Sequence, residues 1–301
     1  MRSLNPLFYY GVLIPVSYLP FSVLYFLSDG LYVLIYKVVG YRKKTVLQNI
    51  ANSFPEKSAA SHQQIMKGYY KHLCDLVVES IKVFTISDRE VRQRMKIVNP
   101  EFIDMFFERG QSVILAGGHY NNWELFAVAI DAAIKHKAVA IYKPMTSAYF
   151  DEKMRLSRSR YGLKMISTKV TKEEFEKTDS LRVIIMGIDQ APSHVKTCYW
   201  SKFLNQDTAM LFGAEKYSKE YHYPVLSGRI NKTKRGHYTF EFTDAIEEPQ
   251  KTKYGYVTER INYLLEQDIK AKPEYWLWSH KRWKYTRPAD RVQAQTNVVS
   301  A

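Results

Sequence analysis

The stretch Val113-Ile114-Leu115-Ala116-Gly117-Gly118-His119-Tyr120-Asn121-Asn122-Trp123-Glu124 decides the fold of this chain. Four apolar residues followed by Gly117-Gly118 predict a buried strand that ends in a tight turn, because paired glycines let the backbone bend and let a substrate approach it. Residues 123–134 have the apolar spacing of a helix. His119 is therefore expected at the C-terminal edge of a sheet, where open α/β sheets bind their ligands.

On both sides of this stretch, strand-like runs alternate with helical ones. The residues predict strands at 113–116, 138–142, 182–188, 224–228 and 238–242, and helices at 61–84, 123–134, 150–161 and 256–269. Such alternation predicts an α/β fold, a mixed sheet covered by helices. The chain has no internal repeat and no clear linker after Arg42, so residues 43–301 are expected to form one domain.

The N-terminus is strongly apolar. Residues 7–27 carry no charge and are long enough to cross the hydrocarbon of a bilayer as a helix. A second apolar run, 31–39, follows a predicted break at Ser28-Asp29-Gly30. Residues 1–42 are therefore predicted to be a membrane anchor, either a spanning helix or a hairpin seated in the interface. A buried hairpin of a soluble protein is the alternative.

Positive charge is placed unevenly around this anchor. Lys37, Arg42, Lys43 and Lys44 follow the apolar stretch, whereas only Arg2 precedes it. This excess predicts that the C-terminal bulk of the chain stays in the cytoplasm. A cleaved signal peptide is disfavoured, because the apolar region is too long and no small-residue cleavage site follows it.

The whole chain is basic. Its 301 residues carry a net charge of +14, which favours an anionic partner: nucleic acid, an acidic protein or an anionic membrane surface. The two cysteines, Cys74 and Cys198, form neither a disulfide framework nor a zinc cluster, and no cluster of metal ligands is present in the sequence. We therefore expect no metal.

His119 and Glu124 are five positions apart. On a continuous helix they would point about 140° away from each other. They could meet if His119 lies in the loop, Asn121 caps the helix and Glu124 is the third helical residue. Glu124 would then hold one ring nitrogen, and the other would act as a general base. The alternative is that Asn121 and Glu124 form a capping box with no catalytic role.

Gly118-His119-Tyr120-Asn121-Asn122-Trp123-Glu124 resembles the box of histidine, four residues and an acid carried by the bacterial late acyltransferases of lipid A biosynthesis, the lauroyl and myristoyl acyltransferases. These belong to the lysophospholipid acyltransferase superfamily. Four further stretches resemble the family in the same order: 41–56, 155–162, Asp189-Gln190 and 275–284. The resemblance covers nearly the whole chain and implies a fold like that of glycerol-phosphate acyltransferase. It also implies that residues 43–301 are the acyltransferase catalytic domain, on the cytoplasmic face of a bacterial inner membrane.

The resemblance also implies a mechanism. His119 would deprotonate the acceptor hydroxyl and Glu124 would orient His119, so that the acceptor attacks a thioester on acyl carrier protein. The substrate-binding residues that it suggests are Arg158, Asp189, Gln190 and Asn122. Arg158 would bind a phosphate through its two-pronged guanidinium. No cofactor is implied beyond the 4′-phosphopantetheine thioester of the carrier, and the implied partners are the carrier, a lipid acceptor and a membrane surface.

Two departures from the family concern the acceptor side. Phe203-Leu204-Asn205 stands where the family usually has Phe-Phe-Gly, and Ala191-Pro192-Ser193 lacks the further acid. The acceptor is thus open: lipid A or a related bacterial glycolipid, or else an aminolipid or pigment lipid. A distant alternative is a nucleic-acid-binding protein that uses Lys281-Arg282-Trp283-Lys284, although no nucleic-acid-binding module surrounds that patch. A serine hydrolase is disfavoured because the chain has no Gly-x-Ser-x-Gly elbow.

Overall fold

The fold is built on a mixed sheet of seven strands in a computed structural model that describes residues 5–193, 195 and 198–288. The strand order is β1-β9-β8-β2-β5-β3-β4, and each pair is parallel except β8 with β9. The strands span Met95–Ile97 (β1), Val113–Gly117 (β2), Lys137–Tyr142 (β3), Lys164–Ser167 (β4), Arg182–Gly187 (β5), Val225–Lys234 (β8) and His237–Ile246 (β9). Residues 289–301 of the predicted catalytic domain lie outside the described residues.

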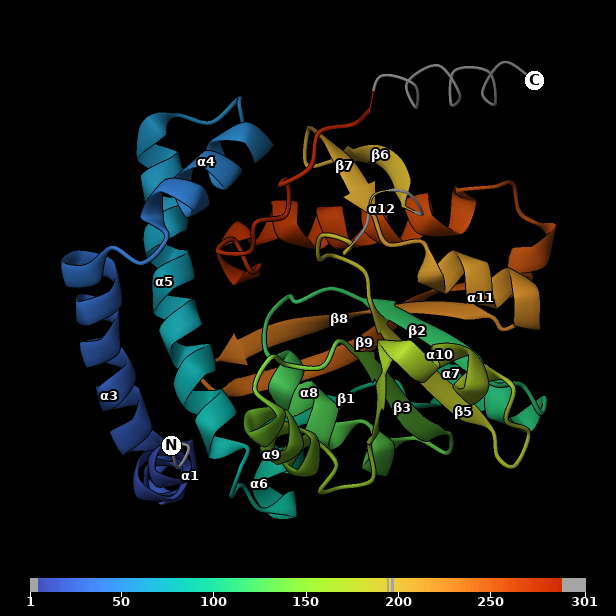
Figure 1. The fold of residues 1–301 in the computed structure, drawn as a ribbon, viewed down its shortest axis with the longest axis horizontal. Helices are drawn as coiled ribbons and strands as arrows, with labels where there is room; N and C mark the ends of the chain where they lie inside the picture. Colours follow the sequence, from blue (N-terminus) through green and yellow to red (C-terminus); the bar gives the residue numbers. More distant parts are fainter. Residues whose placement is uncertain (1–4, 194, 196–197, 289–301) are drawn as a thin grey trace.

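Helices surround this sheet (Figure 1). They are α1 (Asn5–Phe8), α2 (Ile14–Tyr18), α3 (Phe21–Tyr32), α4 (Lys43–Ser53), α5 (Ala59–Lys82), α6 (Asp88–Arg94), α7 (Glu101–Glu108), α8 (Trp123–Ala129), α9 (Ala148–Arg158), α10 (Thr171–Phe175), α11 (Gly213–Tyr221) and α12 (Tyr256–Ala271). A separate antiparallel hairpin joins β6 (Tyr199–Phe203) and β7 (Gln206–Met210). The predicted mixed sheet covered by helices is confirmed.

Alternate residues of β2 face two different cores. Ile114 and Ala116 pack in a cluster with α4, α11, α12 and the β6–β7 hairpin. Val113 and Leu115 pack in a second cluster with α6, α7 and α8. Because side chains alternate along a strand, a strand buried on both faces must be apolar throughout, which is the pattern of residues 113–116. Both faces of the central strand are thus covered by helices.

The N-terminal residues form two helical stretches, and the break between them was predicted at the wrong place. The first stretch ends at Tyr18, and α3 begins at Phe21 after Leu19-Pro20. The chain then stays helical through Ser28-Asp29-Gly30 and ends as a π-helix, Val33–Val39. Ser28 is tolerated inside the helix because it is buried against α5, where its hydroxyl donates to Asp75 Oδ1 at 2.8 Å.

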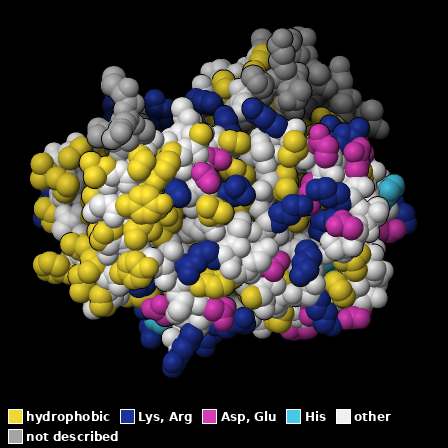
Figure 2. Space-filling model, turned by 60° about the horizontal axis from the view of Figure 1, so that its bottom comes forward, with side chains coloured by type: hydrophobic (Ala, Val, Ile, Leu, Met, Phe, Trp, Pro, Cys, Tyr) yellow, Lys and Arg dark blue, Asp and Glu magenta, His cyan; other side chains and the backbone are white. Residues whose placement is uncertain are grey.

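One side of the molecule is strongly apolar. Figure 2 shows hydrophobic side chains gathered over the N-terminal helices. The exposed large residues of these helices include Leu7, Phe8, Tyr10, Val12, Tyr18, Val23, Phe26, Leu27, Val33, Leu34, Val38 and Val39. Within the described chain, Phe21–Val39 is long and apolar enough to cross a membrane, judged by length and composition.

Two further expectations are corrected by the structure. The helix predicted over 123–134 ends at Ala129 and is followed by a short 3₁₀ turn, Asp131–Ala133. The patch Lys281-Arg282-Trp283-Lys284 does not form an exposed basic and aromatic surface, because Arg282 is buried and Trp283 donates its ring N–H to Thr208 at 2.8 Å. Arg282 itself donates to the carbonyl of Ala209 at 2.7 Å, inside the molecule.

Candidate active site

The candidate site lies where two neighbouring parallel strands end. Gly117 is the last residue of β2 and is paired with Gly187, the last residue of β5. Two residues beyond each of these positions lie His119 and Asp189. Because both strands run in the same direction and end in register, the two side chains emerge together at the C-terminal edge of the sheet.

His119 is held by Asp189. The ring Nδ1 lies 2.7 Å from Asp189 Oδ1, and the backbone N–H of His119 donates to Asp189 Oδ2 at 2.7 Å. Trp276 adds a third contact, since its ring N–H donates to Oδ2 at 2.8 Å. A carboxylate only accepts, so Nδ1 carries the proton and the Nε2 lone pair remains available. This is the arrangement of a general base oriented by an acid.

The pair perturbs the pKa of both groups. Burial by itself would raise the pKa of Asp189, but the charge of His119 and the three hydrogen bonds lower it to about 2. Burial by itself would lower the pKa of His119, but the charge of Asp189, its hydrogen bond and the nearby charge of Glu124 raise it above the ordinary value. The carboxylate therefore stays ionised and makes the imidazole a stronger base.

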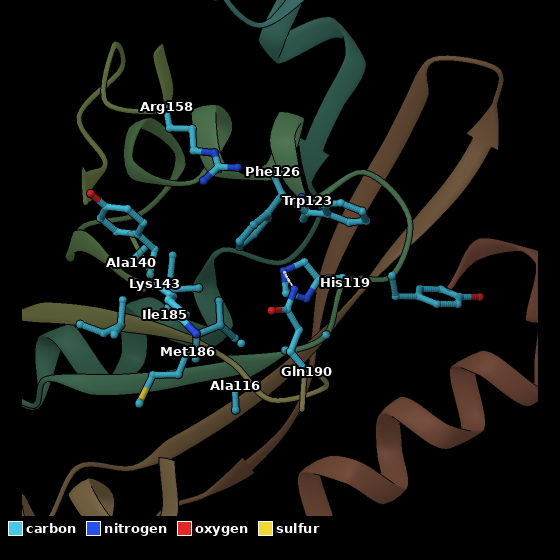
Figure 3. A pocket seen from close by; sticks show the side chains of 18 of the residues that line it. Ala116, His119, Trp123, Phe126, Ala140, Lys143, Arg158, Ile185, Met186 and Gln190 are labelled. Atoms are coloured by element: carbon cyan, nitrogen blue, oxygen red, sulfur yellow. Dashed lines mark hydrogen bonds between the residues drawn. The ribbon is translucent and has the colours of Figure 1, made fainter. Parts of the chain in front are cut away.

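The second ring nitrogen of His119 faces Gln190. Its Nε2 lies 3.3 Å from the side-chain nitrogen of Gln190, and Figure 3 shows the two side chains together at the cavity. The ring also meets Trp123 edge-on, with 5.1 Å between ring centroids. His119 keeps 26% of its side chain exposed, whereas Asp189 keeps 2%. The imidazole is therefore partly open at the cavity, while its partner acid is sealed from water.

Glu124 does not hold the imidazole, contrary to expectation. Both of its oxygens bind Arg158 instead: Nε donates to Oε2 at 2.8 Å and a terminal nitrogen donates to Oε1 at 2.5 Å. Trp123 also donates its ring N–H to Glu124, at 3.1 Å. The two guanidinium nitrogens of Arg158 that were predicted to bind phosphate therefore donate to Glu124 instead. Glu124 influences His119 through its charge, not through a hydrogen bond.

The two asparagines of the box do not take the roles expected of them. Asn122, not Asn121, caps α8, because its side-chain oxygen accepts from the backbone N–H of Leu125 at 2.8 Å. Glu124 is therefore the second helical residue. Asn121 has a left-handed backbone with φ of 56°. Asn122 is fully buried and both ends of its amide are bonded, so its predicted contact with substrate is contradicted.

A cavity of about 580 Å³ opens beside His119. Its interior is mostly apolar, and Figure 3 shows Phe126, Ile185 and Met186 among the side chains that line it. The polar side chains lie toward α9 and the strand ends and include Lys143, Asp151, Arg155, Arg158, Gln190, Arg229 and Asp268. The cavity thus combines a long apolar interior with charged groups and one basic nitrogen.

The C-terminal element closes over the loop that bears His119. Tyr120 and Trp276 form an isolated antiparallel bridge, and the backbone N–H of Asn121 donates to the carbonyl of Tyr275 at 3.0 Å. Reasoning from the sequence did not single out Trp276 as a site residue, although it lies in the stretch 275–284 that resembles the family. Only its contact with Asp189 shows that it belongs to the site.

The chain is similar to known proteins over nearly its full length. The family model of bacterial lipid A biosynthesis acyltransferases matches residues 2–285. The chain is 22% identical to the lipid A biosynthesis lauroyltransferase of Escherichia coli (strain K12), over 92% of this chain and 90% of that protein. It is 20% identical to the lipid A biosynthesis acyltransferase of Haemophilus influenzae, over 95% and 92% of the two chains.

A third relative is the lipid A biosynthesis palmitoleoyltransferase of Escherichia coli (strain K12), which is 21% identical over 92% of this chain and 90% of that protein. The family match spans both the N-terminal helices and the site at His119, so the resemblance inferred from five short stretches is confirmed over nearly the full length. This chain is an acyltransferase and belongs to the bacterial lipid A biosynthesis acyltransferase family.

Proposed function

We propose that this acyltransferase moves a fatty acyl chain from the thioester of an acyl carrier protein to a hydroxyl of lipid A or a related bacterial glycolipid, with His119 as the general base. The observation that carries the proposal is the placement of His119. Its Nδ1 is bonded to the buried Asp189, and its Nε2 lies beside Gln190 at the edge of a mostly apolar cavity of about 580 Å³.

The proposed reaction is an acyl transfer in two parts. His119 Nε2 takes the proton from the acceptor hydroxyl while that oxygen attacks the thioester carbonyl carbon. The resulting tetrahedral species collapses when the carbon–sulfur bond breaks and the pantetheine thiolate leaves. The proton on Nε2 then passes to the thiolate, so the free base and a thiol are the final state. Asp189 stabilises the imidazolium formed in between.

Gln190 and the ion pair of Glu124 with Arg158 surround the reacting position. The side-chain nitrogen of Gln190 lies 3.3 Å from His119 Nε2. An acceptor hydroxyl would bind to this same Nε2, so we propose that Gln190 contacts the acceptor or the developing oxyanion. Trp123 donates a hydrogen bond to Glu124, which pairs with Arg158 at the cavity, so the ion pair supplies two fixed charges there. In this scheme Asp189 orients His119, the role first expected of Glu124.

Charge and shape support the proposed donor and location. The apolar interior of the cavity fits a fatty acyl chain. The net charge of +14 favours both an acidic carrier protein and anionic lipid headgroups. Lys37 lies in the last turn of the apolar helical stretch, and Arg42, Lys43 and Lys44 follow it. We propose that these charges hold the catalytic part on the cytoplasmic face of the inner membrane. Aminolipid or pigment-lipid acceptors remain the alternative.

The test is lipid mass spectrometry on cells with the gene, without it, and with His119→Ala. The proposal expects an acylated lipid species that disappears without the gene and in the variant, and purified variant activity reduced by about 10² to 10⁴-fold. His237→Ala is the matched control, because His237 lies on β9 and bonds the backbone of Gln93. An unchanged lipid profile, or full activity of His119→Ala, would contradict the proposal.

A further inference from the structure

A buried carboxylate supports residues 118–122, the loop that bears His119 and is called the catalytic loop below. Glu79 on α5 has 0% of its surface exposed, yet it accepts hydrogen bonds from three separate parts of the chain. Tyr25 on α3 donates its hydroxyl to Oε1 at 2.8 Å. Asn122 donates its amide to Oε2 at 2.5 Å, and Tyr238 on β9 donates its hydroxyl to the same oxygen at 2.9 Å.

Asn122 connects Glu79 to the site. It precedes the first residue of α8, and its side-chain oxygen accepts from Leu125 N–H at 2.8 Å while its amide nitrogen donates to Glu79. The position of the Asn122 side chain therefore fixes where α8 begins. Glu124 is the second residue of that helix, and its charge raises the pKa of His119. A shift of the start of α8 would therefore move Glu124 relative to His119 and change that pKa.

The same loop is held along its length by other bonds. His119 is bonded to Asp189 at its start, and Asn121 donates its side-chain amide to the carbonyl of Ile230 at 2.6 Å. Asn121 adopts a left-handed backbone with φ of 56°, a conformation that non-glycine residues rarely adopt without support. The contact of Asn122 with Glu79 secures the far end of this strained loop.

Apolar packing alone does not explain a carboxyl at this position. Burial raises the pKa of Glu79 above its ordinary value, while the hydroxyls of Tyr25 and Tyr238 act in the opposite direction. A buried carboxyl is costly unless its oxygens are bonded, and an apolar side chain of the same size would avoid that cost. What an apolar side chain cannot do is accept bonds from α3, α8 and β9 together.

We infer that Glu79 is a positioning residue of the acyl transfer, which holds Asn122 and the start of α8 in place and ties the catalytic loop to helix α3 of the N-terminal anchor. Glu79 touches neither the cavity nor His119, so it acts through Asn122. The inference rests on the proposed function, because the experiment that tests Glu79 measures acyl transfer.

The central experiment compares Glu79→Gln with Glu79→Met in the full chain, using acyl transfer from acyl carrier protein to the acceptor. A glutamine can keep all three contacts: its oxygen accepts from Asn122 and Tyr238, and its amide donates to the hydroxyl oxygen of Tyr25. Methionine has a similar size and accepts none of them well. We expect Glu79→Gln to keep kcat within about threefold of the parent, and Glu79→Met to lose at least about tenfold.

A control separates positioning from loss of stability. Ile103→Ala, in α7 and the second core cluster, creates a cavity away from the site and lowers the melting temperature without touching the loop. The two variants are compared at a temperature where both are folded. Positioning predicts that only Glu79→Met lowers kcat and that the acid limb of its pH profile moves to lower pH, because Glu124 no longer supports the base.

The link to the anchor helix is tested by a double-mutant cycle. Tyr25→Phe removes one hydroxyl from Glu79, whereas Tyr32→Phe changes another tyrosine of α3 whose ring stacks on Tyr36, with 5.3 Å between centroids. We expect Tyr25→Phe to lower kcat and Tyr32→Phe to leave it unchanged. In the Glu79→Met background the effect of Tyr25→Phe should vanish, because the bond it removes is already lost.

Two failures are distinguishable. If the parent transfers acyl groups but Glu79→Met matches it in kcat and pH profile, or loses no more than Ile103→Ala, the positioning role is overturned. If the parent shows no transfer, or His119→Ala transfers as well as the parent, the proposed function fails first. Additive effects of Tyr25→Phe and Glu79→Met would overturn the link to the anchor helix alone.

Discussion

His119 depends on an acid that lies 70 positions away in the sequence. Asp189 is buried, accepts three hydrogen bonds and has a pKa lowered to about 2, so it is ionised throughout the range in which the enzyme works. Its charge and bond raise the pKa of His119. Burial of the acid and exposure of the base are both needed, since a solvated carboxylate would interact more weakly with the ring.

Asp189→Asn tests this dependence directly. The variant keeps the size of the side chain but removes the charge that raises the pKa of His119, so that pKa should fall. A base is active when deprotonated, and the acid limb of the rate profile should therefore move to lower pH. The plateau rate should drop by about 10² to 10⁴-fold, because the ring loses its orientation and its support as an imidazolium.

The measurement for this variant is kcat/KM as a function of pH. Asp268→Asn is a suitable comparison, because Asp268 also lines the cavity but makes no hydrogen bond to His119 within the described chain. An Asp189→Asn profile that is lower but has an unmoved acid limb would show that His119 does not owe its basicity to Asp189.

At the scale of elements, close packing at the turn between β2 and α8 explains one glycine of the pair. Gly118 is tightly enclosed: a Cβ there would lie 2.5 Å from Leu265 Cδ2 and 3.1 Å from Asp189 Oδ2. A Cβ on Gly117 would meet no atom within 4 Å. The two glycines therefore serve different purposes. Gly118 lets α12 and Asp189 approach the backbone, whereas space does not require a glycine at position 117.

This difference predicts unequal effects of two adjacent substitutions. Gly118→Ala should force Leu265 and Asp189 apart and so displace His119, with a loss of activity and an overpacking cost of about 1–3 kcal/mol in unfolding free energy. Gly117→Ala should lose less activity and less unfolding free energy than Gly118→Ala. The measurements are thermal unfolding and acyl transfer for the two variants side by side. Equal losses would mean that the contact with Leu265 and Asp189 does not govern the turn.

Helix α3 shows how tertiary contacts override a local signal. Ser28-Asp29-Gly30 reads as a break, yet the helix continues because α5 and the β8–β9 turn satisfy its polar groups. Ser28 bonds Asp75, and Arg235 pairs with both Asp29 and Asp75 at 2.7 Å. Pro20 does interrupt the helical path, since proline cannot donate a backbone hydrogen bond. The neighbouring elements thus keep Ser28-Asp29-Gly30 helical, where a break was predicted.

At the scale of the whole molecule, the apolar side formed by the N-terminal helices lies next to basic residues. Lys37 and Lys44 are exposed near the end of the apolar stretch. The apolar face supplies hydrophobic contact with lipid, and the lysines add attraction to anionic headgroups, worth about 1 kcal/mol for each charge near the surface. Salt should therefore weaken the electrostatic part of membrane binding and leave the hydrophobic part unchanged.

The combined substitution Lys37→Gln and Lys44→Gln should reduce binding to vesicles of anionic phospholipid at low salt, and the difference from the parent should shrink at high salt. Lys96→Gln with Lys202→Gln removes the same charge from exposed positions on β1 and β6. Co-sedimentation with vesicles measures the bound fraction. If both pairs reduce binding equally, net charge governs attachment and the position of Lys37 and Lys44 does not.

Several features of this protein were determined by the sequence alone. Residues 113–124 predict strand, turn and helix because their apolar spacing and glycine pair are local properties. Local apolar spacing also predicts the amphipathic helices α5 and α12, whose ends were predicted within a few residues. The family box at His119 is also contiguous, so its resemblance could be read without any structure.

The partners within the site were decided only by tertiary structure. Glu124 is near His119 in sequence, but the helical geometry of α8 turns it toward Arg158, whereas the register of β2 with β5 brings Asp189 to the ring. The cap at Asn122 and its bond to Glu79 likewise join α8 to α5. Side-chain hydrogen bonds between distant segments depend on strand register and helix packing, and no local pattern in the sequence encodes them.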